Sequence, residues 1–178
     1  MRIILDAMGG DNAPQAPVLG ALDAVKKFGA QVVLVGRGEE ILNVQKSKGI
    51  SDLPEGVEIA HADDVVDMHD DPATVVRKRK NSSMMIGLKM LADGLGDAFV
   101  SAGSTGALLT GATLLVKRVK GIRRAAMGPA MPNKTGGKTV ILDCGANAEC
   151  TPEFLLQFGL VGSIYAKKCL GIENPKVG

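Results

Sequence analysis

The first 36 residues, MRIILDAMGGDNAPQAPVLGALDAVKKFGAQVVLVG, contain the pattern that decides the fold. Two short apolar runs, at 3–5 and 32–35, flank a stretch from 14 to 28 in which apolar residues recur at helical spacing. We expect Asn12 to cap this helix and Gly29 to end it. The pattern therefore predicts a strand, a helix and a second strand in succession.

The same alternation continues along the rest of the chain. Further strands are expected at 57–60, 97–101 and 139–143. Further helices are expected at 39–48, 82–92, 104–117 and 152–169. Alternating strands and helices are typical of a parallel sheet covered on both faces, so we predict an α/β fold, a three-layer α/β/α sandwich with a mostly parallel sheet. We expect one domain, 1–178, that is the N-terminal portion of a longer chain, since the final residues NPKVG read as a turn into one more strand.

The composition suits a globular domain and narrows the classes of function. Of the 178 residues, 46% are hydrophobic and 22% charged, and the net charge of +2 gives no argument for a nucleic-acid partner. Cys144, Cys150 and Cys169 match neither a zinc site nor a disulfide framework. With no signal peptide or membrane-length apolar run, we expect a cytoplasmic protein.

Three small-residue loops follow predicted strands. They are DAMGGD (6–11), SAGSTG (101–106) and DCGAN (143–147). In a doubly wound sheet the ligand crevice lies at the carboxyl ends of the strands, and free amides at a helix start attract anions. Each loop taken singly also fits a tight turn with a capping residue.

Two charged stretches allow more than one interpretation. RKRK at 77–80 precedes Asn81, Ser82 and Ser83, so it is either a solvated face or part of a phosphate site whose outer residues meet an acidic partner. The acidic and histidine residues between 61 and 71 lack a recognised metal-site spacing, and a solvated acidic loop is the better interpretation.

Five segments, taken in order, give the chain a resemblance to a known family. They are DAMGGDNAP (6–14), VVRKRKNSSM (75–84), DAFVSAGSTGALLTGA (97–112), LDCGANAECTPEFLLQFGLVGSIYA (142–166) and NPKVG (174–178). Together they resemble the N-terminal half of the bacterial phosphate acyltransferases, which convert acyl-acyl-carrier-protein and inorganic phosphate to acyl phosphate and free carrier protein in phospholipid biosynthesis. Ser104 departs from the family, which usually has asparagine there.

The resemblance implies a fold like that of isocitrate and isopropylmalate dehydrogenases and a homodimer. It implies acyl carrier protein and inorganic phosphate as substrates, and a membrane glycerol-3-phosphate acyltransferase as the partner that receives the product. Peripheral contact with the membrane is implied for the full-length chain. Inorganic phosphate is itself the nucleophile in this reaction, so no metal or organic cofactor is expected.

The chemistry of this reaction and the donors of the loops above lead to a hypothesis for the role of each residue. The expected catalytic residues are Lys80, Ser104, Asp143 and Asn147. The expected phosphate-binding residues are Gly9, Gly10, Ser82, Ser83, Ser104, Thr105 and Gly106. The residues expected to dock the carrier protein are Arg77, Lys78, Arg79, Arg123 and Arg124. Asp6, Asp11 and Asp143 are expected to orient the donors.

Two other classes of function remain open at this point. One is a related phosphate acetyltransferase-type enzyme or a decarboxylating dehydrogenase, although GRGEEI at 36–41 lacks the third glycine of a dinucleotide-binding loop. The other is a non-catalytic module that docks carrier protein or a membrane through its basic clusters.

Overall fold

The chain divides into two compact units, Met1–Lys117 and Arg118–Gly178. The computed structural model describes every residue from Met1 to Gly178. Each unit is built from its own helices and strands. The expectation of a single domain over 1–178 stays a prediction.

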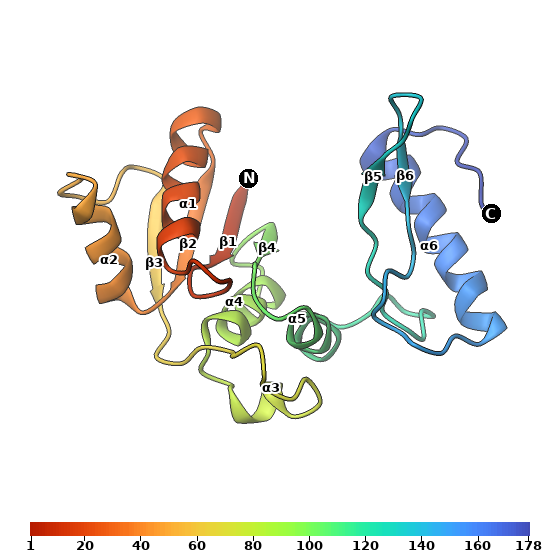
Figure 1. Cartoon of the computed structure of the whole chain (residues 1–178), viewed down its shortest axis with the longest axis horizontal. Helices are drawn as coiled ribbons and strands as arrows, with labels where there is room; N and C mark the ends of the chain where they lie inside the picture. The colour runs from red at the N-terminus through yellow and green to blue at the C-terminus, as the bar shows by residue number, and fades with distance from the viewer. The chain divides into compact units, whose positions relative to one another are not determined.

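A four-stranded parallel sheet in the order β3-β2-β1-β4 lies at the centre of the first unit (Figure 1). Its strands are β1 (Arg2–Asp6), β2 (Gln31–Gly36), β3 (Val57–His61) and β4 (Ala98–Val100). Strand β1 pairs with β2 on one side and with β4 on the other. The strand order therefore reverses between β1 and β4, which is where doubly wound sheets open a ligand crevice at the carboxyl ends of the strands.

Helices cover both faces of this sheet. The helices of the first unit are α1 (Gln15–Phe28), α2 (Gly38–Ser47), α3 (Val75–Lys78), α4 (Ser83–Ala92) and α5 (Thr105–Gly111). On β2, Val32 and Leu34 belong to the apolar cluster shared with α1 and α2. Val33 and Val35 belong to the cluster that α4 covers, as the alternation of side chains along a strand requires. This arrangement confirms the α/β class and the mostly parallel sheet.

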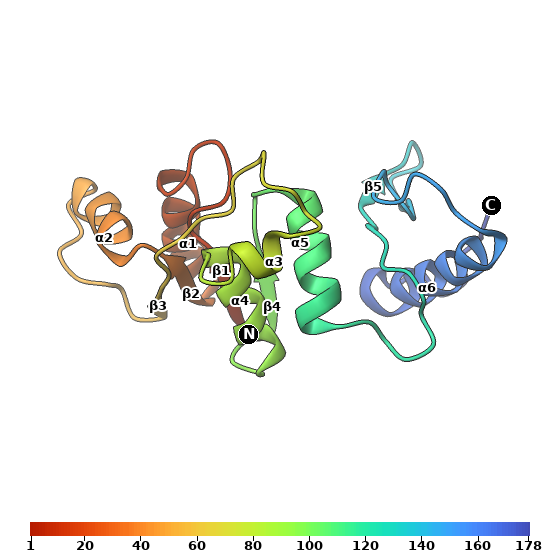
Figure 2. The same ribbon diagram turned by 90° about the horizontal axis from the view of Figure 1, so that it is seen from below.

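The helix ends agree with the sequence in some places and differ in others. Gly29 ends α1 with a left-handed φ of 62°, as predicted. The N-cap of α1 is Pro14 and not Asn12, because residues 11–14 form a turn that delays the helix until Gln15. The helix expected over 104–117 changes to a π-helical segment, η1 (Ala112–Val116), directly after α5, and Figure 2 shows the two as one continuous coil.

The second unit contains a two-stranded sheet and one long helix. These elements are β5 (Ala130–Pro132), β6 (Lys138–Val140) and α6 (Pro152–Leu170). The sequence predicts a strand at 139–143 in the parallel sheet, but β6 pairs antiparallel with β5. The physical reason is the tight turn between them, in which Asn133 Oδ1 accepts hydrogen bonds from the amides of Thr135 and Gly137. So short a connection permits only an antiparallel pair.

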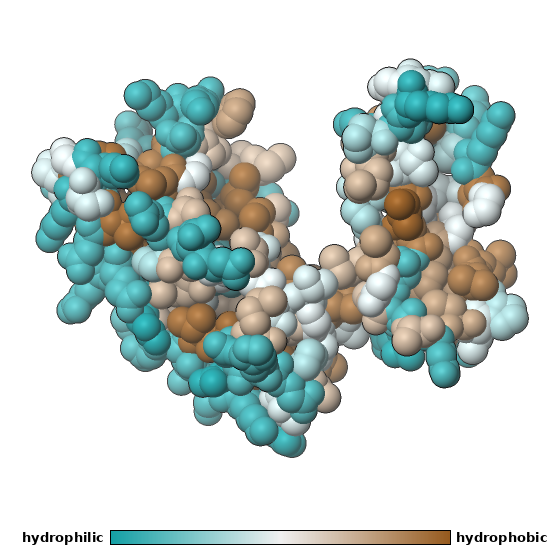
Figure 3. Space-filling model, viewed as in Figure 1, coloured by the Kyte–Doolittle hydropathy of each residue, from teal (hydrophilic) through white to brown (hydrophobic).

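Helix α6 has well-defined ends and a partly uncovered apolar surface. Thr151 caps its first turn by accepting a hydrogen bond from Phe154 N, and Gly171 ends it in a left-handed conformation. Leu156 is 75% exposed, and Figure 3 shows apolar surface on this unit. None of the helices in the chain combines the length and hydropathy that crossing a membrane requires.

Leu34, on β2, tests the packing of the first unit, because its side chain is fully buried against the helices α1 and α2. We expect Leu34→Ala to lower the free energy of unfolding by about 2–5 kcal/mol, since the cavity adds to the lost apolar burial. Urea unfolding measures the change. Leu114→Ala is the matched control, because Leu114 is 57% exposed and its truncation should cost far less.

Candidate functional site

The carboxylate of Asp6, at the end of β1, joins segments that are far apart in the sequence. Ser83 Oγ donates a hydrogen bond to Asp6 Oδ1 at 2.6 Å, and Ser101 Oγ donates to Oδ2 at 2.7 Å. Met8 N also donates to Oδ1, at 3.1 Å. Asp6 is only 2% exposed, and a buried carboxylate is tolerated when donors surround it in this way. Asp6 therefore links the first residue of α4 to the residue that follows β4.

Two glycine loops meet beside this carboxylate. A Cβ atom on Gly9 would lie 2.7 Å from Asp6 Oδ2 and 2.9 Å from Gly103 N, so no larger residue fits there without a shift. Gly10 has a φ of 103°, a conformation that favours glycine. The structure thus brings together two of the three predicted loops at the point where the strand order reverses.

A pocket of about 450 Å³ opens at this junction, which is a size typical of small-molecule sites. Its wall includes Gly9 and Gly10 from one loop and Ser101 and Ala102 from the other. The rest of the lining is Leu5, Asp6, Asp11, Asn12, Ala13, Ala16, Pro17 and Val100. The pocket therefore lies on the expected rim of the sheet.

The two predicted serines before α4 are inside the protein. Ser82 is 0% exposed and caps α4 by accepting a hydrogen bond from Met85 N, and Ser83 is 1% exposed and donates to Asp6. Both hydroxyls thus have partners within the chain. Lys80, two residues earlier, is exposed. The assignment of phosphate to these residues stays a prediction.

The start of α5 keeps hydrogen-bonding capacity. Ser104 caps the helix by accepting a hydrogen bond from Ala107 N at 3.4 Å, which leaves its hydroxyl proton for another acceptor. The first-turn amides at Thr105 and Gly106 have no acceptor within the helix. Thr105 is exposed, and Gly106 lies against Pro72, whose Cγ would be 2.8 Å from a Cβ at position 106.

In the second unit, Asp143 organises the third predicted loop. Met127 N donates to Asp143 Oδ1 at 2.8 Å, and Asn147 donates to Oδ2 through its backbone N at 2.6 Å and its side-chain Nδ2 at 2.7 Å. Burial raises the pKa of this carboxyl, but these hydrogen bonds outweigh it and hold the pKa below its ordinary value. Asn147 Nδ2 also donates to Ala125 O. The expected catalytic roles of Asp143 and Asn147 stay predictions.

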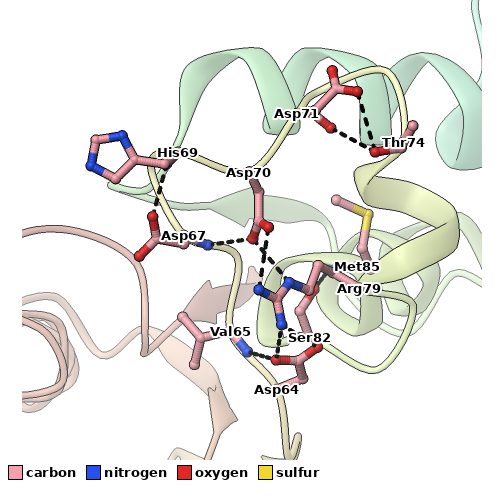
Figure 4. Close-up of polar contacts among 10 residues, drawn as sticks. All are labelled: Asp64, Val65, Asp67, His69, Asp70, Asp71, Thr74, Arg79, Ser82 and Met85. Carbon is pink, nitrogen blue, oxygen red and sulfur yellow. Dashed lines mark hydrogen bonds and ion pairs between the residues drawn. The ribbon is translucent and has the colours of Figure 1, made fainter.

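Three of the five predicted docking residues make contacts within the chain. Arg79 binds the carboxylates of Asp64 and Asp70 (Figure 4). In the second unit, Arg123 pairs with Glu153 and the guanidinium of Arg124 lies 5.4 Å from the centre of the Phe154 ring. Arg77 and Lys78 are exposed on α3. The two are therefore the better candidates of the five for meeting a partner.

The acidic stretch between residues 61 and 71 uses its carboxylates on its own backbone. Asp67 accepts a hydrogen bond from His69 N, and Asp70 accepts one from Asp67 N. Asp71 accepts one from Ala73 N. No group of three or more histidine, cysteine or carboxylate side chains in the chain is arranged to hold a metal ion.

Comparison with known proteins decides the family. The family model described as "Fatty acid synthesis protein" matches residues 1–178. The chain belongs to this family. Phosphate acyltransferases of Clostridioides difficile (strain 630) and Desulfitobacterium hafniense (strain DSM 10664 / DCB-2) are 42% and 46% identical to it, over 99% and 100% of the chain. The chain spans 52% of the length of each relative, and the resemblance to the N-terminal half of these enzymes is confirmed.

Solved structures of phosphotransacetylases have a similar fold. The enzyme from Streptococcus pyogenes aligns with a TM-score of 0.73 at 22% identity, over 97% of this chain and 55% of its own. The EutD phosphotransacetylase from Staphylococcus aureus aligns with a TM-score of 0.66 at 16% identity, over 93% of this chain and 52% of its own. At these identities the likeness concerns the fold alone.

Sequence reasoning missed the part that Ser101 plays in this family member. Its hydroxyl both donates to Asp6 and accepts a hydrogen bond from Gly103 N at 3.1 Å, so it shapes the loop before α5. The available signal was a polar residue at the end of an apolar strand. Pro72 was also missed, because nothing in the sequence indicates that it packs on Gly106.

Replacing Asp6 tests the junction. We expect Asp6→Ala to lower the free energy of unfolding by about 2–4 kcal/mol, because the buried hydroxyl of Ser83 and the half-buried hydroxyl of Ser101 lose their acceptor. Urea unfolding measures the change. Asp11→Ala removes an exposed carboxylate from the same pocket and is the control. Equal stability of the two variants would contradict the role given to Asp6.

Asp143 gives the second unit a pH dependence of known sign. Because its pKa is lower in the folded protein than the usual value, its stabilisation is complete above about pH 4 and is lost as the pH falls through the folded pKa. We expect the stability difference between the protein and Asp143→Asn to shrink on acidification below about pH 4. Unfolding followed across this range measures it, with Glu149→Gln, at an exposed carboxylate, as the control.

Proposed function

We propose that the complete protein containing this chain is a phosphate acyltransferase. It converts acyl-acyl-carrier-protein and inorganic phosphate to acyl phosphate and free carrier protein, in phospholipid biosynthesis. Membership of the family supports this proposal, and so do the names of the relatives. The structural observation that carries it is the close approach of Gly9 to Gly103 where the strand order reverses, beside a pocket of about 450 Å³.

The reaction asks the protein to hold an anion against a thioester. An oxygen of inorganic phosphate attacks the thioester carbonyl carbon, a tetrahedral oxyanion forms, and the bond from carbon to sulfur breaks. The thiolate leaves and takes up a proton as free carrier protein. Oriented donors that hold the phosphate and stabilise the oxyanion supply most of what this reaction needs. Its chemistry requires no metal or organic cofactor.

The donors of the first unit suit this task. We assign phosphate to the glycine loop at Gly9 and Gly10 and to the start of α5 at Ser104, Thr105 and Gly106. The unpaired first-turn amides and the Ser104 hydroxyl proton are the groups that an anion requires. The carboxylate of Asp6 does not contact phosphate in this proposal. It positions the loop by binding Ser101 and Ser83.

Three further residues keep their proposed catalytic roles. Lys80 is exposed just before the buried N-cap of α4 and supplies a positive charge to the dianion. In the second unit, Asp143 and Asn147 stay proposed catalytic residues, and both hydrogens of the Asn147 side-chain amide are donated within that unit, to Asp143 Oδ2 and Ala125 O. Ser82 and Ser83 stay proposed phosphate residues, and in this structure their hydroxyls also hold the start of α4.

The complete protein also has proposed partners. We infer that the complete protein is a homodimer. We also infer that it has the three-layer fold of isocitrate and isopropylmalate dehydrogenases, and the parallel sheet of the first unit supports this fold. We propose that Arg77 and Lys78 meet the acidic acyl carrier protein. We propose that the acyl phosphate passes to a membrane glycerol-3-phosphate acyltransferase. The phosphate acyltransferase itself is then a cytoplasmic enzyme that contacts the membrane peripherally.

A phosphate acetyltransferase-type enzyme is the second candidate, favoured by the fold likeness to phosphotransacetylases. The two functions differ in the thioester used. The complete protein is mixed with phosphate and either acyl-acyl-carrier-protein or acetyl-coenzyme A, and acyl phosphate is measured. Product from the carrier-protein thioester alone supports the proposal. Tight, salt-sensitive carrier binding without product indicates a docking module instead.

Alanine variants of two residues test the phosphate site. We expect Ser104→Ala and Lys80→Ala each to raise the KM for phosphate by about tenfold to a hundredfold, because each removes a hydrogen bond to a charged ligand. Steady-state kinetics with varied phosphate measure it.

The matched controls for these variants lie outside the site. Ser47→Ala changes an exposed serine near the end of α2, and Lys89→Ala changes an exposed lysine on α4. An unchanged KM in both Ser104→Ala and Lys80→Ala shows that the assignment is wrong.

A further inference from the structure

We propose that Arg79 is a positioning residue for the phosphate site, and that it acts through the segment that connects β3 to α4 (residues 62–82, the connecting segment). The proposal rests on the proposed function for its kinetic consequence. Its structural part concerns the chain alone. No contact of Arg79 with a substrate is involved.

The guanidinium of Arg79 holds two carboxylates of the connecting segment at once (Figure 4). Its Nε lies 3.0 Å from Asp70 Oδ2 and its Nη2 3.2 Å from Asp70 Oδ1, which is a bidentate pair. Its Nη1 lies 3.1 Å from Asp64 Oδ1. The hydrogen bond from Arg79 is the main reason that the pKa of Asp70 lies below its usual value. Such a planar fork cannot be replaced by the point charge of a lysine.

The ends of the connecting segment are held by the backbone. Ser83 N donates to Asp64 O at 3.0 Å, and Asp64 pairs with Ser82 in an isolated parallel bridge. Asp64 thereby lies beside the N-cap of α4, one residue away from the Ser83 hydroxyl that binds Asp6. Arg79 therefore binds the carboxylate of Asp64, a residue whose backbone is hydrogen-bonded to Ser83, and Ser83 in turn binds Asp6.

The middle of the connecting segment reaches the start of α5. The Pro72 ring lies against Gly106, so near that a Cβ on that glycine would be 2.8 Å from Pro72 Cγ. Val66 and Val75, on either side of this proline, are buried in a cluster with Ala107 of α5. Pro72 therefore covers one of the residues whose amides are assigned to phosphate.

Apolar burial alone does not hold this part of the connecting segment. Val66 is 8% exposed and Val75 1%, but most of the residues between them are exposed and none is buried. The bond from Arg79 to Asp70 is the contact between that polar stretch and the residues after α3. Without it, we expect residues 67–74 to move away and Pro72 to leave Gly106.

Hydrogen exchange tests the structural part independently of any activity. In Arg79→Ala, we expect amide exchange across residues 66–74 to accelerate by about tenfold or more, because the local opening equilibrium loses its ionic contact. Arg77→Ala removes the same charge from an exposed neighbour on α3 and should leave that exchange unchanged. Unchanged exchange in Arg79→Ala, or equal acceleration in both variants, overturns the proposal.

The kinetic part uses a double-mutant cycle in the complete protein. We expect Arg79→Ala and Asp70→Asn each to raise the KM for phosphate by about tenfold, with little change in the KM for carrier protein. The double variant should be no worse than Arg79→Ala, because both changes break one contact. Arg79→Lys should recover only part of the loss. Additive effects, or a change confined to the KM for carrier protein, mean that Arg79 binds substrate directly and overturn the proposal.

The two proposals fail in different ways. If the unmodified protein forms no acyl phosphate, the proposed function is wrong. The role of Arg79 is then still decided by amide hydrogen exchange, measured in the unmodified protein and in Arg79→Ala with and without inorganic phosphate. Phosphate should slow exchange at residues 104–108 in the unmodified protein and do so less in Arg79→Ala. Equal protection of the two proteins by phosphate overturns the positioning role, whatever the reaction.

Discussion

The buried carboxylate of Asp6 is the interaction on which the first unit depends. It lies at the end of a central strand and accepts hydrogen bonds from Ser83 and Ser101, residues 77 and 95 positions further along the chain. A buried charge is stable only when donors replace the water that it has lost. Because the Asp6 carboxylate requires hydrogen-bond donors, it brings the start of α4 and the end of β4 together. The glycine loops at Gly9 and Gly103 approach each other at the same place.

The second unit uses the same device on a different scaffold. Asp143 follows β6 as Asp6 ends β1, and it collects the amide of Met127 together with the backbone and side chain of Asn147. In both units the carboxylate shapes a small-residue loop from inside, so that the atoms nearest to it are not the atoms available to a ligand. An acidic residue in such a loop is therefore better understood as a support for donors than as a group in contact with an anion.

Charged residues near the site divide into those that meet solvent and those that hold the chain. Arg77 and Lys78 are exposed, whereas Arg79 is turned into the connecting segment by Asp64 and Asp70. The four basic residues of RKRK are identical in charge, so composition cannot separate them. Their positions in the structure separate them, because Arg79 lies next to two carboxylates and Arg77 and Lys78 do not. A basic cluster that suggests one docking surface therefore contains a residue that holds the chain instead.

The sequence by itself determined the α/β class, the ends of several helices and the loops that approach one another, because these depend on local periodicity, on Gly29 and on the serine caps. Only the tertiary structure decided that Ser82 and Ser83 are buried, that β6 joins a hairpin, and that Pro72 packs on Gly106. The physical reason is range. Capping and periodicity act within one or two turns, whereas burial and close approach depend on residues brought together from distant parts of the chain.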